Sequence, residues 1–142
     1  MDVTPNSLMG PPSPVDIAIG DLSSNGLLDI AAIFAGDQPN QENRLLVFEA
    51  DGVGGFVEAE NYATPASAGR LRLGDLDDDD DLDILVNAGD VIWLRNQGSF
   101  YAVSTVVDQG LSASPEVADA FIADIDGDGI LDVGYTEAYG RR

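Results

Sequence analysis

The residues best suited to chemistry in this chain lie between Asp124 and Asp132, where aspartates occupy relative positions 1, 3, 5 and 9. Alternate side chains of a tight loop can converge on one centre, and calcium takes about six to eight oxygen ligands. Gly129, at position 6, permits the positive φ of a sharp turn. The residue after it can offer its backbone carbonyl. The spacing therefore predicts a calcium loop with the ligands Asp124, Asp126, Asp128, Ile130 and Asp132.

This spacing occurs three times, at intervals of about 50 residues, which is typical of repeat architectures. We call residues 21–29 loop 1, residues 75–83 loop 2 and residues 124–132 loop 3. In loop 2 the predicted ligands are the side chains of Asp75, Asp77, Asp79 and Asp83 and the carbonyl of Asp81. In loop 1 the corresponding residues are Asp21, Ser23, Asn25, Leu27 and Asp29.

The three loops depart unequally from this pattern. Ser23 and Asn25 replace carboxylates in loop 1, so we expect loop 1 to bind a cation more weakly. Loop 2 has Asp80 where glycine is expected, and aspartate tolerates a left-handed backbone better than most residues. Its seven aspartates exceed what one cation needs, so loop 2 should be the most strained without metal. We expect Asp78 and Asp80 to face water.

Apolar or alternating stretches precede and follow each loop, so each loop should join two strands. The EF-hand alternative fails because it needs a glutamate at position 12, where this chain has Ala32, Val86 and Tyr135. Two further strands follow in each of the first two repeats. We expect strands at residues 15–20, 30–35, 44–49, 56–60, 70–74, 82–88, 91–95, 100–107, 118–123 and 131–135.

The composition argues against several classes of function. The net charge is −20, which disfavours nucleic acid as a partner. The chain has no histidine, cysteine or lysine, which removes the usual nucleophile systems and a lysine base, so we expect no catalysis here. No run is long and apolar enough for a membrane span. A salt-adapted surface is another interpretation of the acidity, and it is compatible with calcium binding.

The repeats resemble FG-GAP/VCBS-type propeller blades, a family that includes the head of integrin α chains and many secreted bacterial proteins. The resemblance covers residues 15–137 and is clearest at residues 91–100 and 123–132. It implies an all-β fold of four-stranded antiparallel blades, a partial β-propeller of about two and a half blades, with calcium stapling the first two strands of each blade. The expected divisions are a lead-in at residues 1–14 and repeats at residues 15–69, 70–117 and 118–142.

The resemblance implies a non-enzymatic, calcium-binding scaffold for adhesion or recognition of a protein or glycan. The alternative is a segment of a secreted polysaccharide lyase or hydrolase whose catalytic residues lie elsewhere. Residues 1–14 lack signal-peptide features, so an extracellular location requires a longer secreted parent. Further blades of that parent, or self-association, would complete the ring. We expect the aromatic side chains to form inter-blade core rather than a sugar-stacking set: Trp93, Phe48, Phe56, Phe100 and Phe121.

Overall fold

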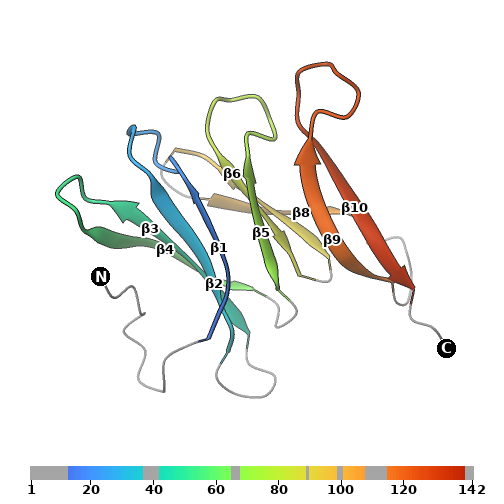
Figure 1. Cartoon of the computed structure of the whole chain (residues 1–142), viewed down its shortest axis with the longest axis horizontal. Helices are drawn as coiled ribbons and strands as arrows, with labels where there is room; N and C mark the ends of the chain where they lie inside the picture. Colours follow the sequence, from blue (N-terminus) through green and yellow to red (C-terminus); the bar gives the residue numbers. More distant parts are fainter. Residues whose placement is uncertain are drawn as a thin grey trace.

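The structure is a computed structural model that describes residues 13–36, 42–64, 68–88, 90–98, 101–107 and 115–139. All regular elements in these ranges are β-strands (Figure 1). None of the described residues forms a helix that could cross a membrane. The strands are β1 (Pro14–Gly20), β2 (Asp29–Phe34), β3 (Asn43–Ala50), β4 (Phe56–Thr64), β5 (Arg70–Gly74), β6 (Asp83–Asn87), β7 (Val91–Asn96), β8 (Tyr101–Val107), β9 (Pro115–Ala123) and β10 (Asp132–Tyr139).

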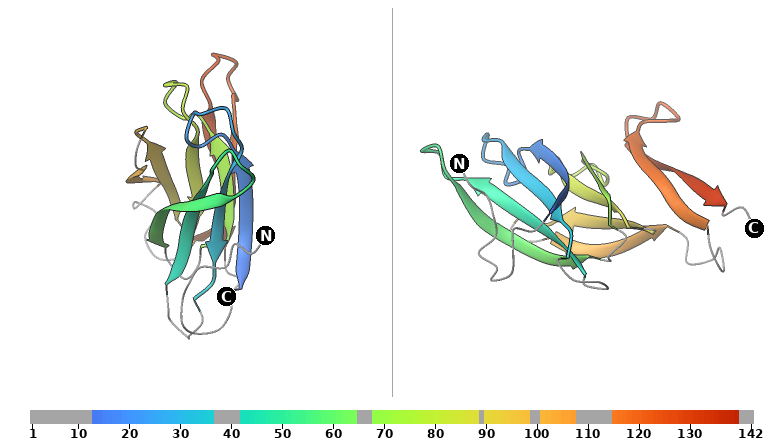
Figure 2. Two further views of the ribbon diagram at one scale, coloured as in Figure 1. Left: turned by 90° about the vertical axis from the view of Figure 1, so that its left-hand side faces the viewer. Right: turned by 60° about the horizontal axis from the view of Figure 1, so that its bottom comes forward.

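The strands form three antiparallel sheets, each built from strands adjacent in sequence. Sheet 1 has the order β1-β2-β3-β4, sheet 2 has the order β5-β6-β7-β8, and sheet 3 pairs β9 with β10. Figures 1 and 2 show the sheets arranged one after another along the molecule, with loops 1, 2 and 3 at the same end. The predicted all-β fold of four-stranded antiparallel blades is confirmed, whereas the predicted repeat boundaries stay predictions.

The observed strands differ from the predicted ones mainly at their ends. β4 continues to Thr64, four residues beyond the expected end at residue 60. Each position-9 aspartate is the first residue of a strand, because it pairs with the last residue before the loop. These pairs are Gly20 with Asp29, Gly74 with Asp83, and Ala123 with Asp132. Each loop therefore closes a hairpin between the first two strands of its sheet.

The largest core lies between sheets 1 and 2. Sheet 1 contributes Ala31, Ile33, Leu45 and Val47 from one of its faces, and sheet 2 contributes Leu71, Ile84, Val86 and Leu94. A second core joins sheets 2 and 3 and is centred on Leu85, Val91 and Ala120. Burial on both faces explains why β2 and β6 are almost continuously apolar.

Two glycines make the sheet-to-sheet contact close. A Cβ at Gly20 would lie 2.8 Å from Leu82 Cδ1 and 2.9 Å from Leu73 Cδ1, both in the next sheet. A Cβ at Gly74 would likewise lie 3.1 Å from both Ile122 Cγ2 and Leu131 Cδ1. The same junction therefore occurs twice, with the glycine before one loop receiving two apolar side chains of the following sheet.

The expectation that the aromatic side chains lie in the core holds for only some of them. Phe48 is buried, Phe56 packs against it in a core on the outer face of sheet 1, and Trp93 packs between sheets 2 and 3. Phe121 is 46% exposed, so the expectation of a core position is wrong for this residue. Its ring lies over Gly134 on the face of sheet 3 that points away from sheet 2. Phe100 lies outside the described residues, as do residues 1–12 of the predicted lead-in.

Candidate metal centres

The first aspartate of each loop organises the loop backbone. Its two carboxylate oxygens accept backbone N–H groups from residues further round the turn, as in an Asx-turn. The distances are 2.7–3.1 Å, with donors Asn25 and Gly26 to Asp21, Asp79 and Asp80 to Asp75, and Gly127 and Gly129 to Asp124. These bonds curve the backbone around the position-1 carboxylate, so hydrogen bonds within the loop hold its shape.

Two residues of each loop, at positions 4 and 6, have a left-handed backbone. Position 6 has φ values of 83° at Gly26, 70° at Asp80 and 94° at Gly129, which confirms that Asp80 takes the conformation expected of glycine. Position 4 was not predicted: it is Gly127 in loop 3, but Ser24 (φ 54°) and Asp78 (φ 60°) in the other loops. Only the glycine of loop 3 signals this turn in the sequence.

The position-9 aspartate of loop 1 is a buried anchor. Asp29 is completely buried. Its Oδ2 accepts the backbone N–H groups of Leu22 (3.0 Å) and Ser23 (2.9 Å) and the Ser23 hydroxyl (2.9 Å). Its Oδ1 accepts the N–H of Ala50, the last residue of β3, at 2.9 Å. One carboxylate therefore joins the loop to the third strand of the sheet.

Loop 2 repeats this anchor. Asp83 is also completely buried, with Oδ2 accepting the Leu76 N–H at 3.1 Å and Oδ1 accepting the Asn96 N–H, at the end of β7, at 2.7 Å. In loop 3 the Oδ2 of Asp132 accepts the Ile125 N–H at 2.9 Å. The position-9 aspartate, which was predicted as a ligand, is therefore an anchor for the loop backbone in all three loops.

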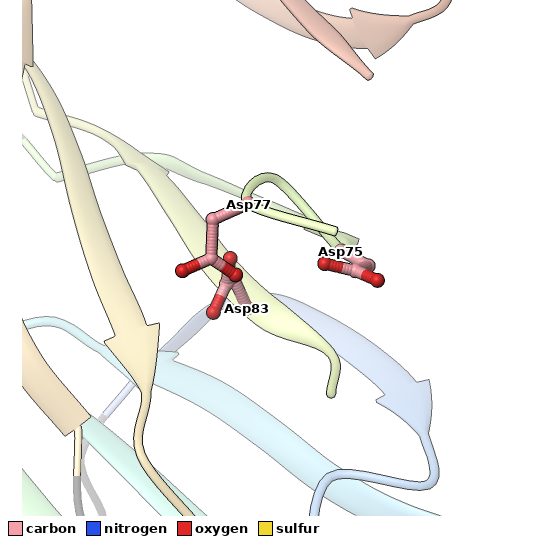
Figure 3. Close-up of side chains that lie close together, drawn as sticks. All are labelled: Asp75, Asp77 and Asp83. Carbon is pink, nitrogen blue, oxygen red and sulfur yellow. The ribbon is translucent and has the colours of Figure 1, made fainter. Parts of the chain in front are cut away.

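Three carboxylates converge in loop 2 and three in loop 3. One carboxylate oxygen from each of Asp75, Asp77 and Asp83 lies within 4.8 Å of the other two. Figure 3 shows the carboxylates of Asp77 and Asp83 together, with Asp75 to one side. In loop 3 the convergent set is Asp124, Asp126 and Asp128, all exposed.

The remaining predicted ligands lie outside these groups. Asp79 and Asp132 belong to neither convergent set among the described residues. Loop 1 has two carboxylates, Asp21 and Asp29, and brings no third one to them. Asp78 and Asp80 are exposed, in agreement with the expectation that they face water. The predicted carbonyl ligands Leu27, Asp81 and Ile130 each donate their N–H to the side chain at position 5 of their loop.

Arg95 of β7 supplies an internal counter-charge to loop 2 that sequence analysis missed. Its Nε contacts the Asp77 carboxylate and its Nη2 lies 3.6 Å from Asp79 Oδ2. Arg95 and Glu49 occupy equivalent positions in their sheets. The residues that follow them, Asn96 and Ala50, both donate their backbone N–H groups to the position-9 aspartate of their loop. The loop richest in carboxylates thus has arginine beside it, whereas the sheet that carries loop 1 has glutamate at the equivalent strand position.

The pKa values of the loop 2 carboxylates are shifted in different directions. Burial raises the pKa of Asp77, the Arg95 guanidinium opposes that rise, and the neighbouring Asp79, Asp83 and Asp75 add to it. Burial also raises the pKa of Asp83, against the backbone N–H groups of Asn96 and Leu76. For Asp75, burial acts to raise the pKa, but the N–H groups of Asp80 and Asp79 together hold it below its usual value. A cation at the convergent oxygens would favour the ionised forms of all three.

The donor set fits a hard divalent cation. All convergent groups are carboxylates, which suit magnesium, calcium or manganese rather than softer metals. The residues that would hold the ion are Asp75, Asp77 and Asp83 in loop 2 and Asp124, Asp126 and Asp128 in loop 3.

Comparison with known proteins agrees with this architecture. No significant match was found among curated proteins or among solved structures. Residues 21–86 match the family model of the FG-GAP-like repeat. The matched segment runs from the first residue of loop 1 through β2–β5 and loop 2 into β6, so it contains two of the loops and the junction between sheets 1 and 2. An FG-GAP-like repeat is thus found over residues 21–86, and the antiparallel sheets are consistent with blades of a partial β-propeller.

Proposed function

We propose that this chain is a calcium-binding repeat module without catalytic activity, acting as an extracellular scaffold for adhesion or recognition of a protein or glycan. Two features support an extracellular scaffold. Calcium loops of modest affinity fill where calcium is about millimolar, outside the cell. The sequence has no histidine, cysteine or lysine, which leaves the carboxylates as the main candidates for catalysis, and the carboxylates that converge among the described residues all lie in loops 2 and 3.

The observation that carries calcium binding is the convergence of three carboxylates in loop 2 and three in loop 3. Bringing three negative charges within 4.8 Å is unfavourable unless a cation compensates them. Each loop also fixes its own shape through hydrogen bonds from its backbone to its position-1 aspartate. The module would therefore use calcium to hold the hairpin end of each sheet rather than to activate a substrate.

Thermal unfolding followed by circular dichroism tests this function. A ligand that binds only the folded state adds about 2.7 kcal/mol of stability at a hundred times its Kd. We therefore expect millimolar calcium to raise Tm by about 5 °C or more over the value in EDTA. Magnesium should do less because it demands a smaller, octahedral site.

A matched pair of variants ties the effect to the site. Asp77→Asn removes one charged member of the convergent group and should weaken calcium binding to loop 2 about tenfold or more in calorimetric titration. Asp80→Asn removes the same charge from the same loop at an exposed position outside that group, and should leave binding nearly unchanged. An equal loss of calcium affinity in both variants would mean that binding depends only on the total charge of the loop. No calcium response in the folded wild type would refute the proposal.

Arg95→Gln should raise the calcium affinity of loop 2. Arg95 lies beside Asp77 and Asp79, so removing its charge removes a repulsion of the incoming ion worth about 1 kcal/mol, or about fivefold in Kd. The same variant should be less stable than wild type in EDTA, because the loop 2 carboxylates lose their counter-charge. Calorimetry and urea unfolding measure the two effects. Arg44→Gln, an exposed arginine of β3 bonded to Asn61, is the charge-matched control and should change neither.

A further inference from the structure

Loops 1 and 2 contact each other directly. The Ser24 hydroxyl, at position 4 of loop 1, donates a hydrogen bond to the carboxylate of Asp81, at position 7 of loop 2. The next residue of loop 2, Leu82, lies against Gly20, the residue before loop 1, where a Cβ would come 2.8 Å from Leu82 Cδ1. The two loops are neighbours at the same end of the molecule (Figure 1). The second half of loop 2 therefore contacts the beginning of loop 1.

A buried asparagine makes a third connection between these loops. Asn96, the last residue of β7, is 4% exposed. Its Nδ2 donates to the carbonyl of Leu22 in loop 1 at 2.8 Å and to the carbonyl of Leu82 in loop 2 at 3.3 Å. Its Oδ1 accepts the Gly98 N–H at 2.9 Å, so donors and acceptor of the amide are all used and its orientation is fixed. One side chain thus bonds the backbones of both loops.

Asn96 also lies between the position-9 carboxylates of the two loops. Its backbone N–H donates to Asp83 Oδ1 at 2.7 Å, and Asp83 belongs to the convergent carboxylates of loop 2. Its side chain bonds the carbonyl of Leu22, and the N–H of Leu22 donates to Asp29 Oδ2 at 3.0 Å. A continuous series of hydrogen bonds therefore joins Asp83 of loop 2 to Asp29 of loop 1.

The equivalent residue of sheet 1 separates the two roles of Asn96. Ala50 ends β3 as Asn96 ends β7, and its backbone N–H likewise donates to a position-9 carboxylate, that of Asp29, at 2.9 Å. The bond to the position-9 aspartate therefore needs only a backbone N–H, which any residue except proline supplies. The side chain of Asn96 is not needed for this anchor, and what it adds is the bond to loop 1.

We propose that Asn96 is a positioning residue through which a cation held by loop 2 also orders loop 1. The inference rests on the proposed calcium binding. Loop 2 brings three carboxylates together, whereas loop 1 has only Asp21 and Asp29, and no third carboxylate of the described residues converges with them. A cation that fixes Asp83 restrains the end of β7, and hydrogen-bond networks between rigid elements can transmit such a restraint to a neighbouring site. Loop 1 would thus gain order from a cation that it does not hold itself.

Amide hydrogen exchange measured by NMR on the whole chain tests this link. The probes are the N–H groups of Leu22 and Ser23, both bonded to Asp29. We expect saturating calcium to slow their exchange about tenfold, which is a usual size for coupling between two sites. Half of this slowing should occur at the calcium concentration that half-fills loop 2.

Asp77→Asn shows which loop holds the cation that orders loop 1. The substitution removes a convergent carboxylate of loop 2 and leaves every ligand candidate of loop 1 in place. The calcium concentrations that half-fill loop 2 and half-protect loop 1 should therefore rise together, about tenfold or more. If the midpoint for loop 1 stays at its wild-type value, loop 1 is ordered by a cation of its own and the proposal is wrong.

Asn96→Ala tests the side chain itself. The variant keeps the backbone N–H that holds Asp83, so calcium should still bind loop 2 in calorimetric titration, but the slowing at loop 1 should be lost. Asn43→Ala is the matched control, because Asn43 is 5% exposed and its Nδ2 donates to the Ala68 carbonyl at 2.8 Å, at the end of sheet 1 away from loop 1. It also loses a buried amide but should keep the calcium response of loop 1. Equal responses in the two variants would refute the role of Asn96.

A comparison in EDTA separates this link from the calcium proposal. Asp75→Ala removes the acceptor of two exposed backbone N–H groups and should loosen loop 2 without any metal. The exchange of the Leu22 amide should then rise about fivefold or more, whereas the same substitution added to Asn96→Ala should change it little. Faster exchange in loop 2 with no response at Leu22 would refute the link. If calcium protects none of the loops, the calcium proposal fails, and this comparison still decides whether the loops are coupled.

Discussion

Asp29→Ala should lower the free energy of unfolding by about 3 kcal/mol or more, in EDTA as well as in calcium. The Asp29 carboxylate is completely buried and accepts from the N–H groups of Leu22, Ser23 and Ala50 and from the Ser23 hydroxyl. Alanine leaves these donors without their acceptor, and an unsatisfied buried donor costs about 1–3 kcal/mol. Urea unfolding followed by circular dichroism measures the loss.

Asp21→Ala is the control for this prediction. Asp21 belongs to the same loop and also accepts two backbone N–H groups, but those donors, on Asn25 and Gly26, are exposed. Water can replace the lost acceptor there, so we expect a loss of about 1 kcal/mol in EDTA. If Asp29→Ala costs stability only when calcium is present, the carboxylate acts as a ligand and not as an anchor. Equal losses for the two variants would also contradict the anchoring role.

Local pattern was enough to predict the loops and the strands that flank them. The Asp-x-Asp-x-Asp spacing identified the position-1 and position-6 residues whose backbone the structure shows to be tightly turned, including the left-handed Asp80. Apolar runs located β2 and β6, because strands covered on both faces lack alternation. Both signals come from residues within about ten positions of each other.

Apart from the left-handed residue at position 4 of each loop, the features that sequence analysis missed depend on which strands pair. Asp29 is an anchor because the end of β3 brings Ala50 to it, and Arg95 reaches Asp77 through the equivalent end of β7. Phe121 is exposed because of the face of β9 on which it lies, which depends on register against β10. A shift of one residue in register would move each of these side chains to the other face, so local composition cannot assign them.

Ile33→Ala in sheet 1 should destabilise sheet 2 as well, and the expected loss is about 2–4 kcal/mol. Ile33 is fully buried in the core shared with Ile84 and Leu94 of sheet 2. Trp93, the single tryptophan of the chain, lies in β7 of sheet 2 and packs between sheets 2 and 3, so it reports on a part of the molecule away from sheet 1. We expect the urea midpoint from Trp93 fluorescence to fall together with the midpoint from circular dichroism. Val57→Ala, a truncation at an exposed position of sheet 1, should change neither.

Whether the Trp93 transition shifts depends on how the stability of the array is divided between the individual sheets and the contacts between them. Repeat arrays gain stability partly from each repeat and partly from the contacts between neighbours. Here the core between sheets 1 and 2 contains most of the fully buried aliphatic side chains of β2 and β6, including Ile33, Ile84 and Val86. The contact between sheets should therefore dominate, and the sheets should unfold as one unit. A Trp93 transition that stays at the wild-type midpoint while the circular dichroism signal is lost earlier would show that each sheet is stable without its neighbour.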